Sequence, residues 1–149
     1  MHGFALNDIF KIGIGPSSSH TMGPMHAAQH FMSNLEKTLW NGALKVSVTL
    51  HGSLAATGDG HGTPGAVTAG LVGHHYETVT LPDIESIWDT AIATVVMRSP
   101  SGHDIQFNPP HDLPRDMDPL ALHPNGMTFR AWAGDALLDE KQYFSVGGG

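Results

Sequence analysis

Four hydroxyl side chains and one imidazole lie close together in the sequence near the start of the chain. The segment contains, in order, Ser17, Ser18, Ser19, His20 and Thr21. It leads into a helical pattern of apolar residues, and the N-terminus of a helix carries partial positive charge and unpaired N–H donors. This serine–histidine segment (residues 17–21) therefore suits the binding of a carboxylate or a phosphate. A structural alternative stays open, because serine is also a common N-cap residue.

The same segment does not match the known nucleotide-binding motifs. Two glycines precede it, but the third glycine of a dinucleotide fingerprint is missing because position 18 is serine. The Gly-Lys-Ser/Thr ending of a Walker loop is also missing.

A second polar group follows the clearest strand pattern of the chain. His51-Gly52-Ser53 ends that strand, and the glycine-rich stretch Gly58-Asp59-Gly60-His61-Gly62 follows closely. Residues just beyond the C-terminal end of a strand often bind ligands in α/β proteins, and glycine lets the backbone approach a ligand. Gly60 and His61 are therefore candidate site residues. The alternative is a plain turn with an exposed histidine.

A third group is His123-Pro124-Asn125-Gly126, directly before another strand pattern. Asn-Gly is ordinary turn chemistry, so a turn is the simpler interpretation, with Asn125 as a candidate ligand contact.

Histidine pairs raise the question of a metal site. His26 and His30 are four residues apart on one predicted helix, a spacing that can place two imidazoles on one ion. No carboxylate completes the pattern, and the adjacent His74 and His75 would point apart in regular structure. We therefore expect no metal site in this chain.

Composition limits the classes of function. A length of 149 residues corresponds to about one domain, and 40% of the residues are hydrophobic. The chain has only seven Lys plus Arg, and its formal net charge is −7. Nucleic acid and membranes are therefore not expected as partners. The chain contains no cysteine, which excludes disulfides and thiolate-bound metals within it. The start lacks the pattern of a signal peptide, so we expect a cytoplasmic protein.

Periodicity predicts the elements that position these groups. Asn7–Phe10 is expected to form a short helical turn, and a Gly134-Asp135 turn is expected to join the last two strands. Residues 99–125 are expected to be mostly irregular. The predicted helices are Met25–Leu39, Thr63–Val72 with Thr63 as its cap, and Asp83–Met97 with Asp83 as its cap; the predicted strands are Leu44–Leu50, Asp104–Phe107, Met127–Trp132 and Leu137–Val146.

The alternation of strands and helices predicts an α/β sandwich with a mixed β-sheet. We expect a single domain over residues 1–149. The final Gly147-Gly148-Gly149 is typical of a linker, where a longer polypeptide could continue.

Several blocks together resemble the iron–sulfur L-serine dehydratases of bacteria, and specifically their N-terminal beta domain. The longest block runs from Phe10 to Met25 and includes the serine–histidine segment. The others follow in the family's order: Gly52-Ser53-Leu54-Ala55, Gly58-x-Gly60-His61-Gly62-Thr63, His123-x-Asn125-Gly126-Met127 and Tyr143–Gly149. The chain departs from the family at Pro64-Gly65, where a charged pair is common, and residues 74–119 carry no family motif.

This resemblance implies a function and partners. Such enzymes deaminate L-serine to pyruvate and ammonia, in amino-acid degradation and gluconeogenesis, with a 4Fe–4S cluster that acts on the substrate hydroxyl. The cluster is held by a larger catalytic alpha domain, expected after Gly149, so this chain alone is expected to be inactive. The smaller domain resembles the allosteric substrate-binding domain of phosphoglycerate dehydrogenase, which implies an α+β fold with a mixed β-sheet flanked by helices, and a homodimer is expected.

The resemblance also implies roles for residues. The serine–histidine segment and Thr21 within it would face the active site across the domain interface and bind the substrate carboxylate, with Gly60 and Asn125 nearby. His20 or His61 would assist proton transfer, since an imidazole titrates near neutral pH. One alternative is a non-catalytic regulatory domain that binds serine or another small anionic effector. Another is an interaction module that only presents an apolar face to a partner.

Overall fold

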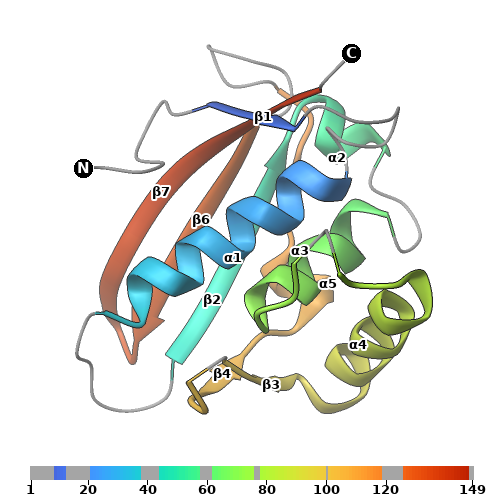
Figure 1. Cartoon of the computed structure of the whole chain (residues 1–149). Helices are drawn as coiled ribbons and strands as arrows, with labels where there is room; N and C mark the ends of the chain where they lie inside the picture. Colours follow the sequence, from blue (N-terminus) through green and yellow to red (C-terminus); the bar gives the residue numbers. More distant parts are fainter. Residues whose placement is uncertain are drawn as a thin grey trace.

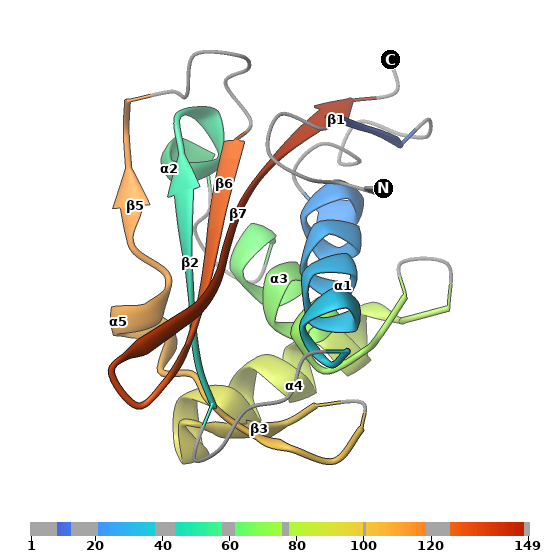
Figure 2. The ribbon, with the colours of Figure 1, turned by 90° about the vertical axis from the view of Figure 1, so that its left-hand side faces the viewer.

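Figure 1 shows a mixed β-sheet with helices packed against it. The structure is a computed structural model and describes residues 9–12, 21–37, 44–57, 62–75, 78–99, 101–118 and 126–147. Within these ranges, seven strands join into one sheet. Figure 2, seen along the sheet, places α1, α3 and α4 together on one side of it.

Three long antiparallel strands form the centre of the sheet. They are β2 (Leu44–His51), β6 (Gly126–Ala133) and β7 (Ala136–Gly147). Every second side chain of β2 faces the helices and is fully buried, because alternate residues of a strand point to opposite faces. The predicted strands here are confirmed, as is the turn at Gly134-Asp135, where Gly134 has a φ of 59°.

Short strands complete the sheet on both sides, in the order β1-β7-β6-β2-β4-β3, with β5 also paired to β2. The strand β1 (Ile9–Ile12) runs parallel to β7. On the other side, β4 (Asp104–Gln106) and β5 (Arg115–Asp116) run parallel to β2, and β3 (Val96–Arg98) runs antiparallel to β4. The predicted α+β class with a mixed sheet is confirmed.

Two helices cross in close contact above the sheet. The helix α1 (Gly23–Leu35) packs on α3 (Thr63–Leu71), and a short helix α2 (Ser53–Thr57) follows β2 directly. A Cβ atom at Gly70 would lie only 2.3 Å from the carbonyl oxygen of Met25. Glycine at this position therefore lets the two helix backbones approach.

The helix α4 (Leu81–Thr94) covers α3 from outside and begins with a capping box. The Thr80 side chain accepts a hydrogen bond from the Asp83 N–H, and the Asp83 carboxylate accepts one from the Thr80 N–H. The helix ends at Val95, which has a φ of 52°. A single turn, α5 (Pro109–Asp112), lies beside β2.

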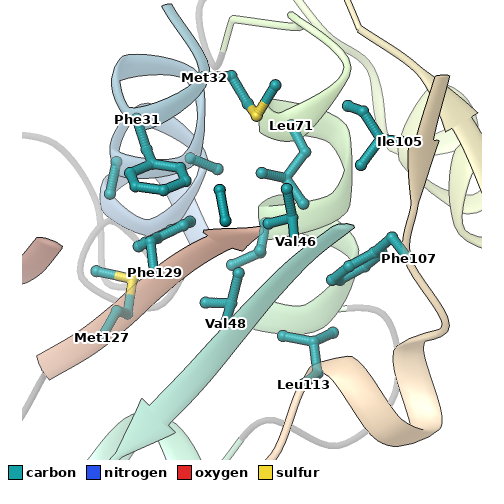
Figure 3. Packing of buried hydrophobic residues seen from close by; sticks show 14 of the residues in the cluster. Phe31, Met32, Val46, Val48, Leu71, Ile105, Phe107, Leu113, Met127 and Phe129 are labelled. Carbon is teal, nitrogen blue, oxygen red and sulfur yellow. The ribbon is translucent and has the colours of Figure 1, made fainter. Parts of the chain in front are cut away.

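The core lies between the sheet and the helices. Figure 3 shows Phe31 of α1 facing Phe129 of β6, and their ring centroids are 5.2 Å apart. Phe129 also meets the ring of Tyr143 edge-on, at 5.3 Å. Burial of such rings is the main source of stability for a domain of this size.

Several predicted boundaries were wrong. Ile9 and Phe10 belong to strand β1 instead of a helical turn, because they pair with Phe144 and Ser145 of β7, a contact that local sequence does not reveal. The predicted strand Asp104–Phe107 is confirmed as β4, whereas α5 and β5, also within residues 99–118, were not predicted.

The predicted helix caps also need correction. The helix predicted at Asp83–Met97 is α4, which begins at Leu81 and ends at Thr94. Asp83 is therefore its third residue instead of its cap, and Met97 lies in strand β3. The N-cap of α3 is Gly62 instead of Thr63. The first helix ends at Leu35, and the predicted residues 38 and 39 lie outside the described part of the chain.

Candidate functional site

One end of the sheet gathers the residues that flank the predicted site segments. The last residues of β1 and β7, Ile12 and Gly147, are register partners there. Gly126, the first residue of β6, pairs with Phe144, and Met127 pairs with Leu50 near the end of β2. One end of the sheet therefore contains the ends of β1, β2 and β7 and the start of β6 (Figure 2).

The start of α1 lies at the same end of the sheet (Figure 1). Thr21 and Met22 form a wider turn that leads into the helix, and both are half-buried. Met22 occupies the N-cap position, and its side chain makes no capping hydrogen bond. The serines that could cap this turn lie outside the described residues, so the capping alternative stays open.

Of the predicted site residues, Thr21 is the one within the described ranges. The remaining ones lie outside the described residues: Ser17, Ser18, Ser19, His20, Gly60, His61 and Asn125. Described neighbours flank each of them. Residues 12 and 21 bracket the first group, residues 57 and 62 the second, and residues 118 and 126 the third.

A buried histidine occupies the centre of this end of the sheet. His51 is the last residue of β2 and is only 7% exposed. Its Nε2 atom lies 2.8 Å from the hydroxyl of Thr128 on β6. Its Nδ1 atom lies 3.7 Å from the carboxylate of Asp116 at the end of β5, which is too long for a hydrogen bond.

The protonation of His51 follows from these surroundings. Burial lowers the pKa of the imidazole below its ordinary value, the Asp116 carboxylate opposes this by raising the pKa, and Arg130 lowers it further. The net shift is downward, so His51 is neutral at neutral pH.

Sequence reasoning placed His51 at a strand end but did not select it as a site residue. The alternation of β2 could have done so, because His51 shares a face with the polar Ser47 and Thr49, opposite the buried Leu50. The contacts with Asp116 and Thr128 join residues 65 and 77 positions apart, and no local pattern indicates them.

Of the histidine pair on α1, His30 has a structural role. The Nδ1 atom of His30 lies 3.1 Å from the hydroxyl of Tyr143, a fully buried residue of β7. This bond satisfies a phenol that would otherwise be costly to bury. Within the described residues, no group of three His, Cys, Asp or Glu side chains could hold a metal ion.

A separate hollow of about 380 Å³ lies between α3, α4 and α5. Trp88, Leu113 and Arg115 are among its lining residues, and its other walls are proline and isoleucine. It offers few groups that could transfer protons, so the end of the sheet is the better candidate for chemistry.

No helix in the described ranges is long and apolar enough to cross a membrane.

Comparison with known proteins agrees with the resemblance in the sequence. The family model described as serine dehydratase beta chain matches residues 5–149. The chain is 40% identical to L-serine dehydratase 1 of Escherichia coli (strain K12) over 147 residues, which cover 97% of this chain and 32% of that protein. It is 39% identical to L-serine dehydratase of Helicobacter pylori (strain 26695) over 150 residues, covering 100% of this chain and 33% of the relative.

L-serine dehydratase of Mycobacterium tuberculosis (strain CDC 1551 / Oshkosh) is 45% identical over 152 residues, covering 95% of this chain and 31% of that protein. The chain thus spans about a third of the length of the curated relatives it matches. On this evidence, the chain belongs to the serine dehydratase beta chain family.

Proposed function

We propose that this chain is the smaller part of an L-serine dehydratase, which deaminates L-serine to pyruvate and ammonia. It acts together with a catalytic alpha domain that holds a 4Fe–4S cluster. The observation that carries the proposal is that described residues flanking the family motifs lie at one end of the sheet. Two of the motif segments are flanked there by described residues: the serine–histidine segment by Ile12 and Thr21, and the segment before β6 by Gly126. His51 also lies there and immediately precedes residues 52–57, which lead to the glycine-rich segment.

The roles of the motif residues follow from their chemistry. The hydroxyls of the serine–histidine segment bind the carboxylate of L-serine, next to the N–H groups at the start of α1. His20 or His61 assists proton transfer, because an imidazole can hold or release a proton near neutral pH. Gly60 and Asn125 contact the substrate from the neighbouring segments. This end of the sheet thereby forms one wall of an active site at the domain interface.

The residues of this chain do not fit an iron–sulfur cluster. Thiolates are the usual ligands of such clusters, and the chain contains no cysteine. The proposal therefore assigns the cluster to the alpha domain, and this chain contributes binding and proton transfer only.

Reconstitution with the alpha domain tests the proposal. The chain and the cluster-bearing alpha domain of serine dehydratase are mixed anaerobically with L-serine, and pyruvate release is followed. We expect pyruvate from the mixture and none from this chain alone. Equal pyruvate release by the alpha domain without this chain would contradict the proposal. Together with binding of L-serine to the isolated chain by calorimetry, that result would favour a regulatory domain for a small anionic effector.

Other expectations from the sequence stay predictions. They are the homodimer, the cytoplasmic location, the alpha domain after Gly149 and the likeness to the phosphoglycerate dehydrogenase domain. Sedimentation of the purified chain at several concentrations measures the first of these.

A further inference from the structure

His51 lies where three strands of the sheet come together at the candidate site. Its backbone ends β2, and the following N–H of Gly52 donates a hydrogen bond of 2.8 Å to the carbonyl oxygen of Asp116 on β5. The N–H of Leu50 donates a similar bond of 2.9 Å to the carbonyl oxygen of Pro114. The backbone at His51 is therefore tied to β5 on one side and, through the sheet register, to β6 on the other.

We propose that His51 is a positioning residue: its ring holds the start of β6 against the end of β2 and, once protonated, draws the end of β5 toward it. It thereby sets the described residues that border segments 58–61 and 119–125. This inference rests on the proposed function for its catalytic consequence, but the contacts that define it belong to the chain itself.

The two ring nitrogens of His51 face different strands. Nε2 is 2.8 Å from the Thr128 hydroxyl, two residues after the start of β6. Nδ1 faces a carboxylate oxygen of Asp116, 3.7 Å away. The other oxygen of that carboxylate accepts a 3.0 Å hydrogen bond from the N–H of Asp118, the last described residue before segment 119–125. One imidazole therefore bonds Thr128 near one border of this segment and faces Asp116 near the other without a hydrogen bond.

The same residue borders the glycine-rich segment. Gly52 follows His51 with a φ of 57°, a conformation that favours glycine, and α2 begins at Ser53. The short helix α2 ends at Thr57, immediately before residues 58–61. Movement of His51 would therefore tilt α2 and move the start of that segment.

The charges around His51 make this arrangement sensitive to pH. Asp116 on β5 faces the ring, and Arg130 on β6 acts on it from the sheet, where Arg130 is itself paired with Glu140 of β7. A neutral ring needs no charge partner, whereas an imidazolium attracts the Asp116 carboxylate toward hydrogen-bond distance. Since burial lowers the pKa of His51, the neutral arrangement is the one present at neutral pH.

The alternative is that His51 only fills space in the core. Both ring nitrogens of such a histidine are expected to have hydrogen-bond partners. The Nδ1 atom of His51 instead makes no hydrogen bond and faces the carboxylate of Asp116, which is exposed. This favours a residue that changes its contacts on protonation over one that only fills space.

The test uses three variants of the full chain. His51→Gln keeps a polar group that can reach Thr128 but cannot carry a charge, and His51→Phe keeps a ring but loses both polar contacts. Asp116→Asn removes the facing charge at an exposed position and keeps the oxygen that accepts the Asp118 N–H bond. His75→Gln, an exposed histidine replaced in the same way, is the matched control.

The first measurement needs no partner. Hydrogen exchange of the Gly52 N–H in the isolated chain is compared with that of Val48, in the middle of β2. We expect His51→Phe to speed exchange at Gly52 at least tenfold and to leave Val48 unchanged. In the unmodified chain, NMR titration should give a pKa for His51 below the ordinary value of an imidazole, and in Asp116→Asn the pKa of His51 should be lower still, because that carboxylate raises it. Unchanged Gly52 exchange and an ordinary pKa for His51 would overturn the proposal.

The second measurement uses the complex with the alpha domain and L-serine. We expect His51→Phe to lower kcat/KM at least tenfold at pH 8, His51→Gln to stay within about twofold of the unmodified chain, and His75→Gln to have no effect. On acidification, the unmodified complex should lose activity earlier than His51→Gln. Equal pH profiles for these two would refute the positioning role. A complex in which even the unmodified chain is inactive would contradict the proposed function, while the exchange and titration results would still decide the inference.

Discussion

Gly70 of α3 packs against the backbone of α1, and replacing it with alanine tests how tightly this contact holds the start of α1. A Cβ at position 70 would lie 2.3 Å from the carbonyl oxygen of Met25 and 2.8 Å from the Cβ of Ala28. Carbon and oxygen atoms that are not bonded need about 1 Å more than the first of these distances. Since the closest atom belongs to the backbone, α1 and α3 must separate by roughly that amount.

The expected loss of stability is the difference between two effects. Alanine in a helix is favoured over glycine by about 1 kcal/mol. An extra methyl group in a well-packed contact lowers the free energy of unfolding by about 1–3 kcal/mol. We expect Gly70→Ala to lie at the upper end of this range, because the Met25 carbonyl oxygen belongs to the backbone and cannot rotate away. We therefore expect the free energy of unfolding to fall by about 2 kcal/mol. Because Met25 lies in the first turns of α1, the shift should also reach Thr21 and the serine–histidine segment.

Urea denaturation of the isolated chain, followed by circular dichroism, measures this loss. The matched control is Gly62→Ala, since a Cβ at Gly62 meets no atom within 4 Å. Because Gly62 is the N-cap of α3, we expect the control to lose no more than about 1 kcal/mol, the cost of alanine at an N-cap. A Gly70→Ala chain as stable as the control would refute the packing argument.

Three further predictions concern the helix ends. Val95→Gly should raise the free energy of unfolding by about 1 kcal/mol, measured in urea, because Val95 has a φ of 52° that a β-branched residue adopts at a cost; no gain would contradict the strain. Thr80→Ala should lower it by about 1 kcal/mol, because the capping box is lost, whereas exposed Thr78→Ala should have little effect. Burial tends to raise the pKa of Glu36, but hydrogen bonds from Ser101 and Ser99 outweigh this and lower it. Glu36→Gln should therefore lose less than about 1 kcal/mol at neutral pH, and this difference should vanish as the pH falls through the folded-state pKa; a constant difference in acid would be inconsistent with it.

The central part of the sheet could be predicted from the sequence because its signal is local. Alternation of apolar and polar residues in Leu44–Leu50 is enough to predict β2, and Gly134-Asp135 marks the turn between β6 and β7. The helical patterns of α1, α3 and α4 come from apolar residues on the face toward the core.

The edges of the sheet could not be predicted, because distant residues create them. Ile9–Ile12 becomes a strand by pairing with β7, more than 130 residues away. The short β5 is held by hydrogen bonds from Leu50 and Gly52, on a strand that local patterns do not relate to it. The end of α4 at Val95 was missed because valine is an unusual residue for a left-handed backbone.

The candidate site likewise has residues that the sequence could indicate and one that it could not. Motif resemblance located the serine–histidine segment, Gly60, His61 and Asn125, since those residues lie in continuous blocks. His51 was not selected, because its partners Asp116 and Thr128 come from distant strands.

The central claim is that the serine–histidine segment serves catalysis from this end of the sheet. The most direct test measures kcat/KM for pyruvate release by the complex of this chain with the cluster-bearing alpha domain, with His20→Ala and the exposed His75→Ala side by side. We predict that His20→Ala lowers the rate at least tenfold, roughly 1.4 kcal/mol, while His75→Ala leaves it unchanged. Equal rates for both variants would contradict the claim.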